Sequence, residues 1–217
     1  MGNLSERSLR GMLAVLFVAA VGFAIACATP PVMNSASVQT FVEPSLQPGA
    51  VKSIAVFPMR NVRLRPDEVR EVNRSITEGF RKQNPQLKIV GATESVTMLN
   101  EGGLTEKYSE FLRNYSQSSI PDVKTLQEIG RSLGVNAILQ GEVFSVTQAD
   151  AANINYYGKT SLKVRYILLS TSNGSILWDS TGSAFKLSQR GQPAPTIYEV
   201  IQLGQEKILN SLPTLAQ

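Results

Sequence analysis

The sequence predicts one α/β domain, with a mixed β-sheet flanked by helices, preceded by a signal peptide and a flexible tether. Three observations predict this arrangement. Hydrophobic residues make up 42% and charged residues 18% of the 217 residues, which is the composition of a folded chain. Strand-like and helix-like patterns alternate from residue 50 onward, as they do in α/β domains. An uncharged run near the N-terminus stands apart from both patterns.

Residues 1–26 have the layout of a lipoprotein signal peptide. Arg7 and Arg10 precede an uncharged run, 11–26, which is shorter than the roughly 20 residues that cross a bilayer. The run ends in Ala24-Ile25-Ala26-Cys27, which resembles a bacterial lipobox. That resemblance implies cleavage before Cys27, an S-diacylglycerol group on its thiol and an N-acyl chain on its new amino group. The alternative is a buried free cysteine at the end of an uncleaved apolar helix.

Residues 27–49 are predicted to form a lipidated linker. The segment is rich in proline and serine and shows no apolar periodicity, so it has the character of a tether. Two or three acyl chains at Cys27 would hold the protein on a membrane stably, because each buried methylene contributes about 0.8 kcal/mol. The folded domain is therefore expected at 50–217.

The first half of this domain predicts a strand, a helix, a strand and a short helix. Val51 to Met59 is a nearly continuous apolar run, typical of a strand buried on both faces. Pro66, an acidic first turn and apolar residues at helical spacing predict a helix that ends at Asn84-Pro85. A brief strand at 87–90 and a short helix at 93–99 follow.

The middle of the domain predicts a capped helix followed by a long strand. Ser119 to Asp122 has the spacing of a capping box, and the apolar face that follows ends at Gly134. The run 135–146 is long enough to cross a sheet. Within it, Gly141 indicates a bulge or a close approach of backbone.

The last part of the domain predicts a hairpin and a final helix. Alternating residues at 162–168 and the turn Ser172-Asn173-Gly174 lead into a second strand, 176–187. Thr196 and Glu199 form a capping box before an amphipathic helix. The expected order is strand, helix, strand, short helix, helix, three strands and a helix.

Four of these segments together resemble a known family, the CsgG-like and LpoB-like bacterial lipoproteins, whose domain is related to the amino-terminal domain of TolB. They are Lys52 to Pro58, Asp122 to Gly134, Asn136 to Val143 and the hairpin around Asn173. The resemblance implies a non-enzymatic role at the cell envelope, as a secretion pore, an activator of a peptidoglycan synthase or a component of surface machinery.

The polar segments 105–119 and 147–159 are too short to supply the long amphipathic hairpins of a secretion pore. The predicted function is therefore a membrane-anchored periplasmic lipoprotein that serves as a non-catalytic interaction or assembly module. The alternative is an accessory ring component of an outer-membrane secretion or export channel.

The expected partners are the lipid bilayer, through Cys27, and envelope proteins, with a homo-oligomer left open. The residue after Cys27 is Ala28 and not aspartate. By resemblance to enterobacterial sorting, this favours an anchor in the outer membrane, facing the periplasm. The 21 basic and 17 acidic residues are spread along the chain, so no nucleic-acid-binding stripe is predicted.

Catalysis, a metal and a cofactor other than the lipid are not predicted. The chain has no histidine and one cysteine, which excludes imidazole chemistry and intrachain disulfides. Glu142 is interpreted as an exposed or ion-paired carboxylate. Trp178 is expected to pack at the edge of the sheet with Asp179 facing water, and Gly102-Gly103 is interpreted as a turn.

Two groups of aromatic residues remain as candidates. Tyr156 and Tyr157, in the polar loop before a strand, are the candidate partner contact, because tyrosine is enriched at interface hot spots. The alternative is that their rings cover the sheet. The stripe Tyr108, Phe111 and Tyr115 recurs at helical spacing and is interpreted as core.

Overall fold

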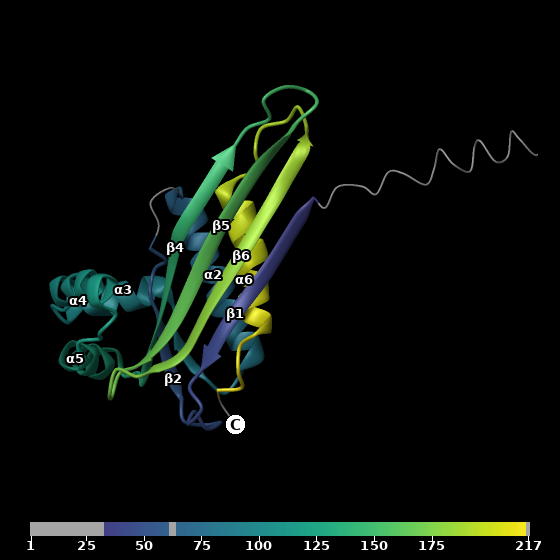
Figure 1. Cartoon of the computed structure of the whole chain (residues 1–217). Helices are drawn as coiled ribbons and strands as arrows, with labels where there is room; N and C mark the ends of the chain where they lie inside the picture. Colours follow the sequence, from purple (N-terminus) through teal and green to yellow (C-terminus); the bar gives the residue numbers. More distant parts are fainter. Residues whose placement is uncertain (1–32, 61–63, 216–217) are drawn as a thin grey trace, which may run out of the picture. The chain divides into compact units, whose positions relative to one another are not determined.

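The computed structural model describes residues 33–60 and 64–215, and its folded unit begins at Met33 (Figure 1). The predictions for the signal peptide and Cys27 lie outside the described residues. The elements in chain order are β1 (Asn34–Val42), β2 (Ser53–Val56), α2 (Pro66–Gln83), β3 (Lys88–Val90), α3 (Ala92–Glu101), α4 (Thr105–Ser118), α5 (Val123–Leu133), β4 (Ala137–Ala149), β5 (Tyr157–Ser170), β6 (Ile176–Arg190) and α6 (Ile197–Asn210).

The strands form one six-stranded mixed sheet in the order β1-β6-β5-β4-β2-β3. Strand β2 pairs in parallel with β3 and β4, whereas the β4–β5, β5–β6 and β1–β6 pairs are antiparallel. The predicted fold class, an α/β domain on a mixed sheet, is confirmed.

Helices α2 and α6 cover one face of the sheet (Figure 1). They bury the inward side chains of β5 and β6 together with Ile54 and Val56 of β2. Trp178 of β6 is fully buried here, and its ring meets Phe80 of α2 edge-on, with centroids 5.8 Å apart. Edge-to-face packing of this kind adds to the burial of apolar area, so this layer is the larger part of the core.

Helices α3, α4 and α5 cover the other face only beside β2 and β3 and over the adjoining ends of β4 and β5 (Figure 1). Their cluster centres on Phe57, which stacks on Tyr108 at a centroid distance of 4.3 Å. Ala55 and Phe57 face this cluster while Ile54 and Val56 face the first one. The prediction that the first apolar run is a strand buried on both faces is thereby confirmed.

The structure corrects the start of the α5 helix. The predicted capping box from Ser119 to Asp122 does not form, because Ser119 closes the preceding helix in a left-handed conformation, φ 57°. Asp122 is the N-cap instead, and its carboxylate accepts from the backbone N–H groups of Lys124 and Thr125. The Thr125 hydroxyl also donates to this carboxylate. This bond contributes most to the lowered pKa of Asp122, and the two backbone bonds add to it.

Helix α4 was not in the predicted order of elements. Its aromatic stripe nevertheless behaves as predicted, since Tyr108 and Phe111 are buried and Tyr115 is half-buried against them. Apart from Leu112, the remaining side chains of the segment are polar, which is why the helix is weakly marked in the sequence.

Strand β1 contradicts the predicted tether over residues 34–42. It pairs with β6 along its whole length, from Asn34 opposite Lys186 to Val42 opposite Trp178. Its inward side chains are small or hydroxylated, namely Ala36, Val38 and Thr40. Such residues produce no strong apolar alternation, so the strand escapes a pattern search.

A pair of substitutions distinguishes a strand from a tether. Val38→Asp should lower the free energy of unfolding by roughly 2 kcal/mol, because it places a carboxylate against the α6 layer. Gln39→Asp, on the exposed side of the same strand, should change it by less than about 0.5 kcal/mol. Urea denaturation measures both, and equal effects of the two changes would contradict the strand.

The predicted polar loop 147–159 is shorter than expected. Strand β4 continues to Ala149 and β5 begins at Tyr157. The register of β4 shifts between Val143 and Ser145, and not at Gly141. Gly141 instead makes room for the side chain of Tyr166. A Cβ there would lie 2.5 Å from the ring of Tyr166. The close approach predicted at Gly141 is therefore made by a ring and not by backbone.

Candidate interaction surfaces

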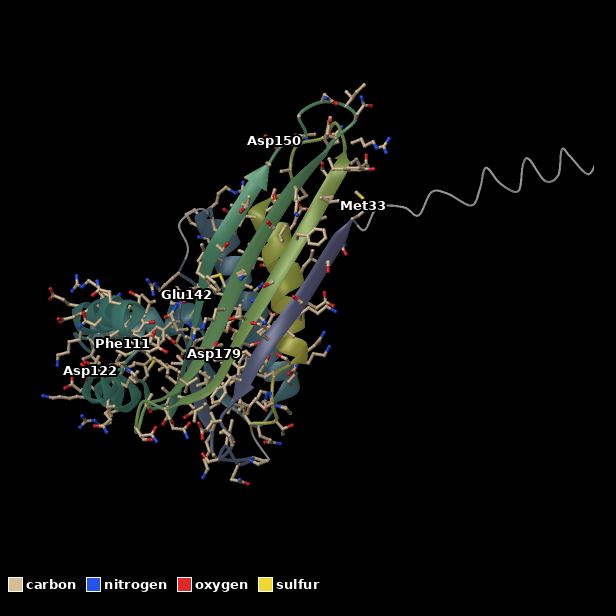
Figure 2. All side chains as sticks on the ribbon, in the orientation of Figure 1. Met33, Phe111, Asp122, Glu142, Asp150 and Asp179 are labelled. Carbon is tan, nitrogen blue, oxygen red and sulfur yellow. The ribbon has the colours of Figure 1, made fainter. Side chains whose placement is uncertain are left out.

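Among the described residues, no helix covers the side of the sheet opposite α2 and α6 over most of β1, β6, β5 and the later part of β4 (Figure 2). Burial alternates along these strands: Thr160, Leu162 and Val164 are buried, while Lys159, Ser161 and Lys163 between them are not. We call this surface the open face. Its side chains are Ser35, Ser37, Gln39, Phe41, Glu142, Ser145, Thr147, Lys159, Ser161, Lys163, Arg165, Asp179, Thr181, Ser183 and Phe185.

The open face carries hydroxyls, ammonium groups and one central aromatic ring. A shallow groove of about 340 Å³ lies on it, lined by serines of β1, β5 and β6. The ammonium of Lys159 lies 5.1 Å from the centre of the Phe185 ring, a cation–π arrangement that exposes the ring only in part. The surface can therefore donate many hydrogen bonds to a partner, and Phe41, which is 48% exposed on β1, adds apolar area to it.

A row of alternating charges borders the open face where helix α4 begins to cover the sheet. Arg165 holds Asp179 with two hydrogen bonds, the Nε–Oδ1 pair at 2.9 Å. Glu142 stands beside Arg165 on the next strand and pairs with Arg60, with 3.5 Å between Oε2 and Nη1. The hydrogen bonds that Arg165 donates to Asp179 raise the pKa of Arg165.

This row contains both carboxylates for which the sequence analysis made a prediction, Glu142 and Asp179. Glu142 is ion-paired, as interpreted. Asp179 does not face water as predicted, because Arg165 covers it and leaves its side chain 19% exposed. Trp178 is not at an edge either, since β1 pairs outside β6. The correction for Trp178 follows from β1, the strand that was not predicted from the sequence.

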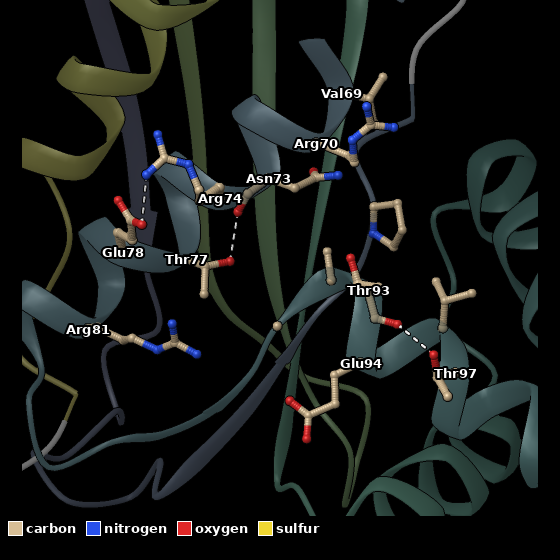
Figure 3. Close-up of a pocket in the computed structure, with 14 residues that line it drawn as sticks. Val69, Arg70, Asn73, Arg74, Thr77, Glu78, Arg81, Thr93, Glu94 and Thr97 are labelled. Atoms are coloured by element: carbon tan, nitrogen blue, oxygen red, sulfur yellow. Dashed lines mark hydrogen bonds and ion pairs between the residues drawn. The ribbon is translucent and has the colours of Figure 1, made fainter. Parts of the chain in front are cut away.

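A second hollow, of about 690 Å³, lies between α2 and α3 (Figure 3). Three arginines of α2 line it, and two of them are paired with neighbouring groups. Arg74 pairs with Glu78 at 2.9 Å and with Glu71, which raises the pKa of Arg74. Arg81 donates to the carbonyl of Ile89 at 3.3 Å.

The structure separates the two candidate tyrosines. Tyr156 projects from the β4–β5 loop and is 59% exposed. Tyr157 is half-buried, and its hydroxyl accepts from Nε of Arg190 at 3.0 Å while the guanidinium lies 5.5 Å from the ring centre. Tyr156 thus has the exposure that a partner contact requires, and partner contact by the pair remains a prediction.

Sequence reasoning missed several exposed apolar side chains. Ile154, in the same loop as Tyr156, is 79% exposed. Phe41 and Phe144 on the strands are exposed as well. An isolated isoleucine between two asparagines is a signal that could have marked the loop, whereas the two phenylalanines look like ordinary strand residues.

The described residues contain neither a membrane-crossing helix nor a metal-binding cluster. None of the helices described in the structure combines the length and apolar character needed to cross a membrane. Within residues 33–60 and 64–215, histidine, cysteine and carboxylate side chains form no cluster of three or more that could hold a metal ion. Cys27 lies outside these ranges.

Comparison with known proteins gives no family-model match and no curated relative. Among solved structures, the chain is similar to a PelC dodecamer from Paraburkholderia phytofirmans (18% identity, TM-score 0.47, covering 84% of this chain and 99% of that one). It is also similar to lipoprotein GNA1162 from Neisseria meningitidis (15%, TM-score 0.41, 64% and 86%). The LpoB C-terminal domain from Escherichia coli follows (19%, TM-score 0.35, 61% and 82%).

These structures include LpoB, which the sequence resemblance anticipated, and they lend no support to the CsgG-like part of that resemblance. TM-scores this low carry no argument about what the chain does. The function has to be argued from the residues of this chain and from the surfaces described above.

Proposed function

We propose that this chain is a membrane-anchored lipoprotein of the bacterial cell envelope that acts as a non-catalytic interaction module, facing the periplasm from the outer membrane. In this proposal Cys27 carries the lipid, and an envelope protein binds the open face. The observation that carries the proposal is the open face itself, where four long strands leave their outward side chains uncovered.

Charge and hydrogen bonding support a protein partner on this face. Lys163 and Gln39 are exposed, and no hydrogen bond within the described residues uses either side chain. The neighbouring row of Asp179, Arg165, Glu142 and Arg60 pairs two carboxylates with two guanidinium groups, so it can come out of water at lower cost than free charges. A partner of acidic or hydroxyl-rich character would complement the lysines.

The test is capture of envelope proteins by the tethered, lipidated protein. The double change Lys163→Glu with Gln39→Glu should lower recovery of a specific partner about tenfold or more, since like charges would then meet across the interface. The matched control is Lys207→Glu with Gln202→Glu, which makes the same change of charge on the exposed side of α6. Equal recovery with both double variants would exclude the open face as the binding surface.

The alternative, a ring component of an export channel, has its own observation in β1. The outer edge of this nine-residue strand pairs with no other described strand, and edges of that length pair readily with another chain. Repeated head-to-tail pairing would close a ring. The mass of the lipidated protein in detergent decides this point, because a monomer at high concentration would remove the alternative.

A further inference from the structure

Strand β1 brings the folded domain close to the proposed anchor. The predicted tether, 27–49, would span up to roughly 70 Å when extended, but β1 begins only seven residues after Cys27. From Cys27 to Met33 the chain reaches about 20 Å at most. This inference rests on the proposed lipidation of Cys27. With the lipid on Cys27, Met33 lies within that distance of the lipid headgroups.

The geometry of the sheet shows which end of the domain this brings to the membrane. The carbonyl of Met33 accepts from the backbone N–H of Leu187 at 2.7 Å, near the end of β6. The β4–β5 loop lies at the same end, as the positions of Met33 and Asp150 in Figure 2 show. The N–H of Gly191 donates to the carbonyl of Tyr156 at 2.9 Å, which ties this loop to the end of β6.

Two loops make up this end, 151–156 and 191–195, and we call them together the tip. Neither loop contains a charged residue, in a chain that is 18% charged overall. Ile154 is the most exposed large hydrophobic side chain of the described residues, and Tyr156 is 59% exposed beside it. Met33 adds a third partly exposed apolar side chain.

Several polar groups of the tip are hydrogen-bonded. The N–H of Ala194 donates to the carboxylate of Asp150 at 2.8 Å, and the N–H of Asn155 donates to the side-chain oxygen of Asn153 at 2.9 Å. Gly158 lets residue 194 lie directly on β5, since a Cβ there would come within 2.6 Å of the backbone nitrogen of Ala194. Satisfied backbone groups lower the cost of leaving water.

Basic side chains stand immediately behind the tip. Arg190 and Lys159 are both exposed at the ends of β6 and β5. Apolar residues with a tyrosine at the level of the headgroups and basic residues behind them form the pattern of an interfacial membrane contact. Anionic headgroups attract each such basic residue by about 1 kcal/mol.

We propose that the tip is a second membrane contact, in which Ile154 and Tyr156 enter the headgroup region of the same bilayer that holds the lipid on Cys27. The tip and the lipid fix two points of the domain. The sheet then stands on the membrane by one end, and its open face remains accessible from the side.

The test uses the single cysteine of the chain. Acylation occupies the thiol of Cys27, so an introduced cysteine is the only free thiol of the mature protein. Ile154→Cys and, as matched control, Ile120→Cys are labelled with an environment-sensitive fluorophore in the lipidated full chain. Ile120 is 72% exposed and lies near the β5–β6 turn, roughly 40 Å away along β5. Both proteins are placed in vesicles of phosphatidylethanolamine and phosphatidylglycerol.

With nitroxide-bearing lipids in the vesicles, the label at position 154 should lose most of its fluorescence and the label at 120 should lose none. Adding Tyr156→Glu should restore the fluorescence at 154, because a carboxylate opposes insertion. Tyr156→Trp should leave the quenching intact, because tryptophan also favours the interface.

Three outcomes overturn the proposal. A label at 154 that only aqueous iodide quenches shows a tip in water, and mass spectrometry of an acylated Cys27 in the same sample leaves the proposed anchoring standing. A label shielded from both quenchers shows that a second protein chain covers the tip. Protein that fails to float with the vesicles, with an unmodified thiol at Cys27, overturns the anchor and the tip contact together.

Discussion

Replacing Trp178 by alanine should lower the free energy of unfolding by about 3–5 kcal/mol, the range for large-to-small changes at buried aromatic residues. Trp178 is fully buried near the start of β6, beneath α2 and α6. Its ring packs edge-on against Phe80, and its indole N–H makes no hydrogen bond among the described residues. The loss is therefore one of packing, with no polar group left unpaired by the change.

Urea denaturation followed by circular dichroism measures this effect, since the variant loses the chain's only tryptophan. Phe144→Ala is the control. Phe144 lies at the irregularity of β4 and is 51% exposed, so its removal should cost less than about 0.5 kcal/mol. A loss below about 1 kcal/mol for Trp178→Ala would contradict the packing of α2 and α6 against β6.

Replacing Cys27 by serine should abolish membrane attachment. Serine cannot carry the thioether-linked diacylglycerol, so the precursor stays unprocessed or the protein is released. Two or three acyl chains hold a protein stably at about 0.8 kcal/mol per buried methylene, far more than the few exposed side chains of the tip contribute. None of the described helices is long and apolar enough to substitute for them.

Fractionation and flotation measure the attachment, and processing of the wild type should be sensitive to globomycin. The control is Ala28→Ser, which keeps the thiol and should be acylated normally. An unmodified thiol at Cys27 in membrane-extracted wild-type protein, shown by mass spectrometry, would end the lipobox interpretation.

Local signals explain which parts of the fold could be predicted. The helix ending at Gly134 follows from its apolar face and from a glycine with φ 62°, and the α6 helix from the reciprocal bonds of Thr196 and Glu199. The β5–β6 hairpin follows from the turn before Ser175. Each of these signals is complete within a few residues, because helix and strand periodicity and caps depend on near neighbours.

The candidate surfaces were less predictable. The carboxylates of Glu142 and Asp179 were visible as charges, but their partners Arg60 and Arg165 come from other segments of the chain. The open face is the part of the sheet that no described helix covers. The residue pattern within β5 or β6 does not predict where the helices lie. The sequence marks the tyrosine pair because tyrosine is common at interfaces. The exposure of Tyr156 and the hydrogen bond from Arg190 to Tyr157 are visible only in the structure.

The sequence by itself determined the α/β class, most of the helices and strands, and the lipid-anchor hypothesis at Cys27. Only the tertiary structure decided that residues 34–42 are a strand, because Thr40 meets Ser180 across 140 positions of sequence and its small neighbours carry no local pattern. That pairing adds a strand where a tether was predicted and moves Trp178 from the edge of the sheet into its interior. Pairing between distant strands is stabilised by contacts that exist only once the chain has folded.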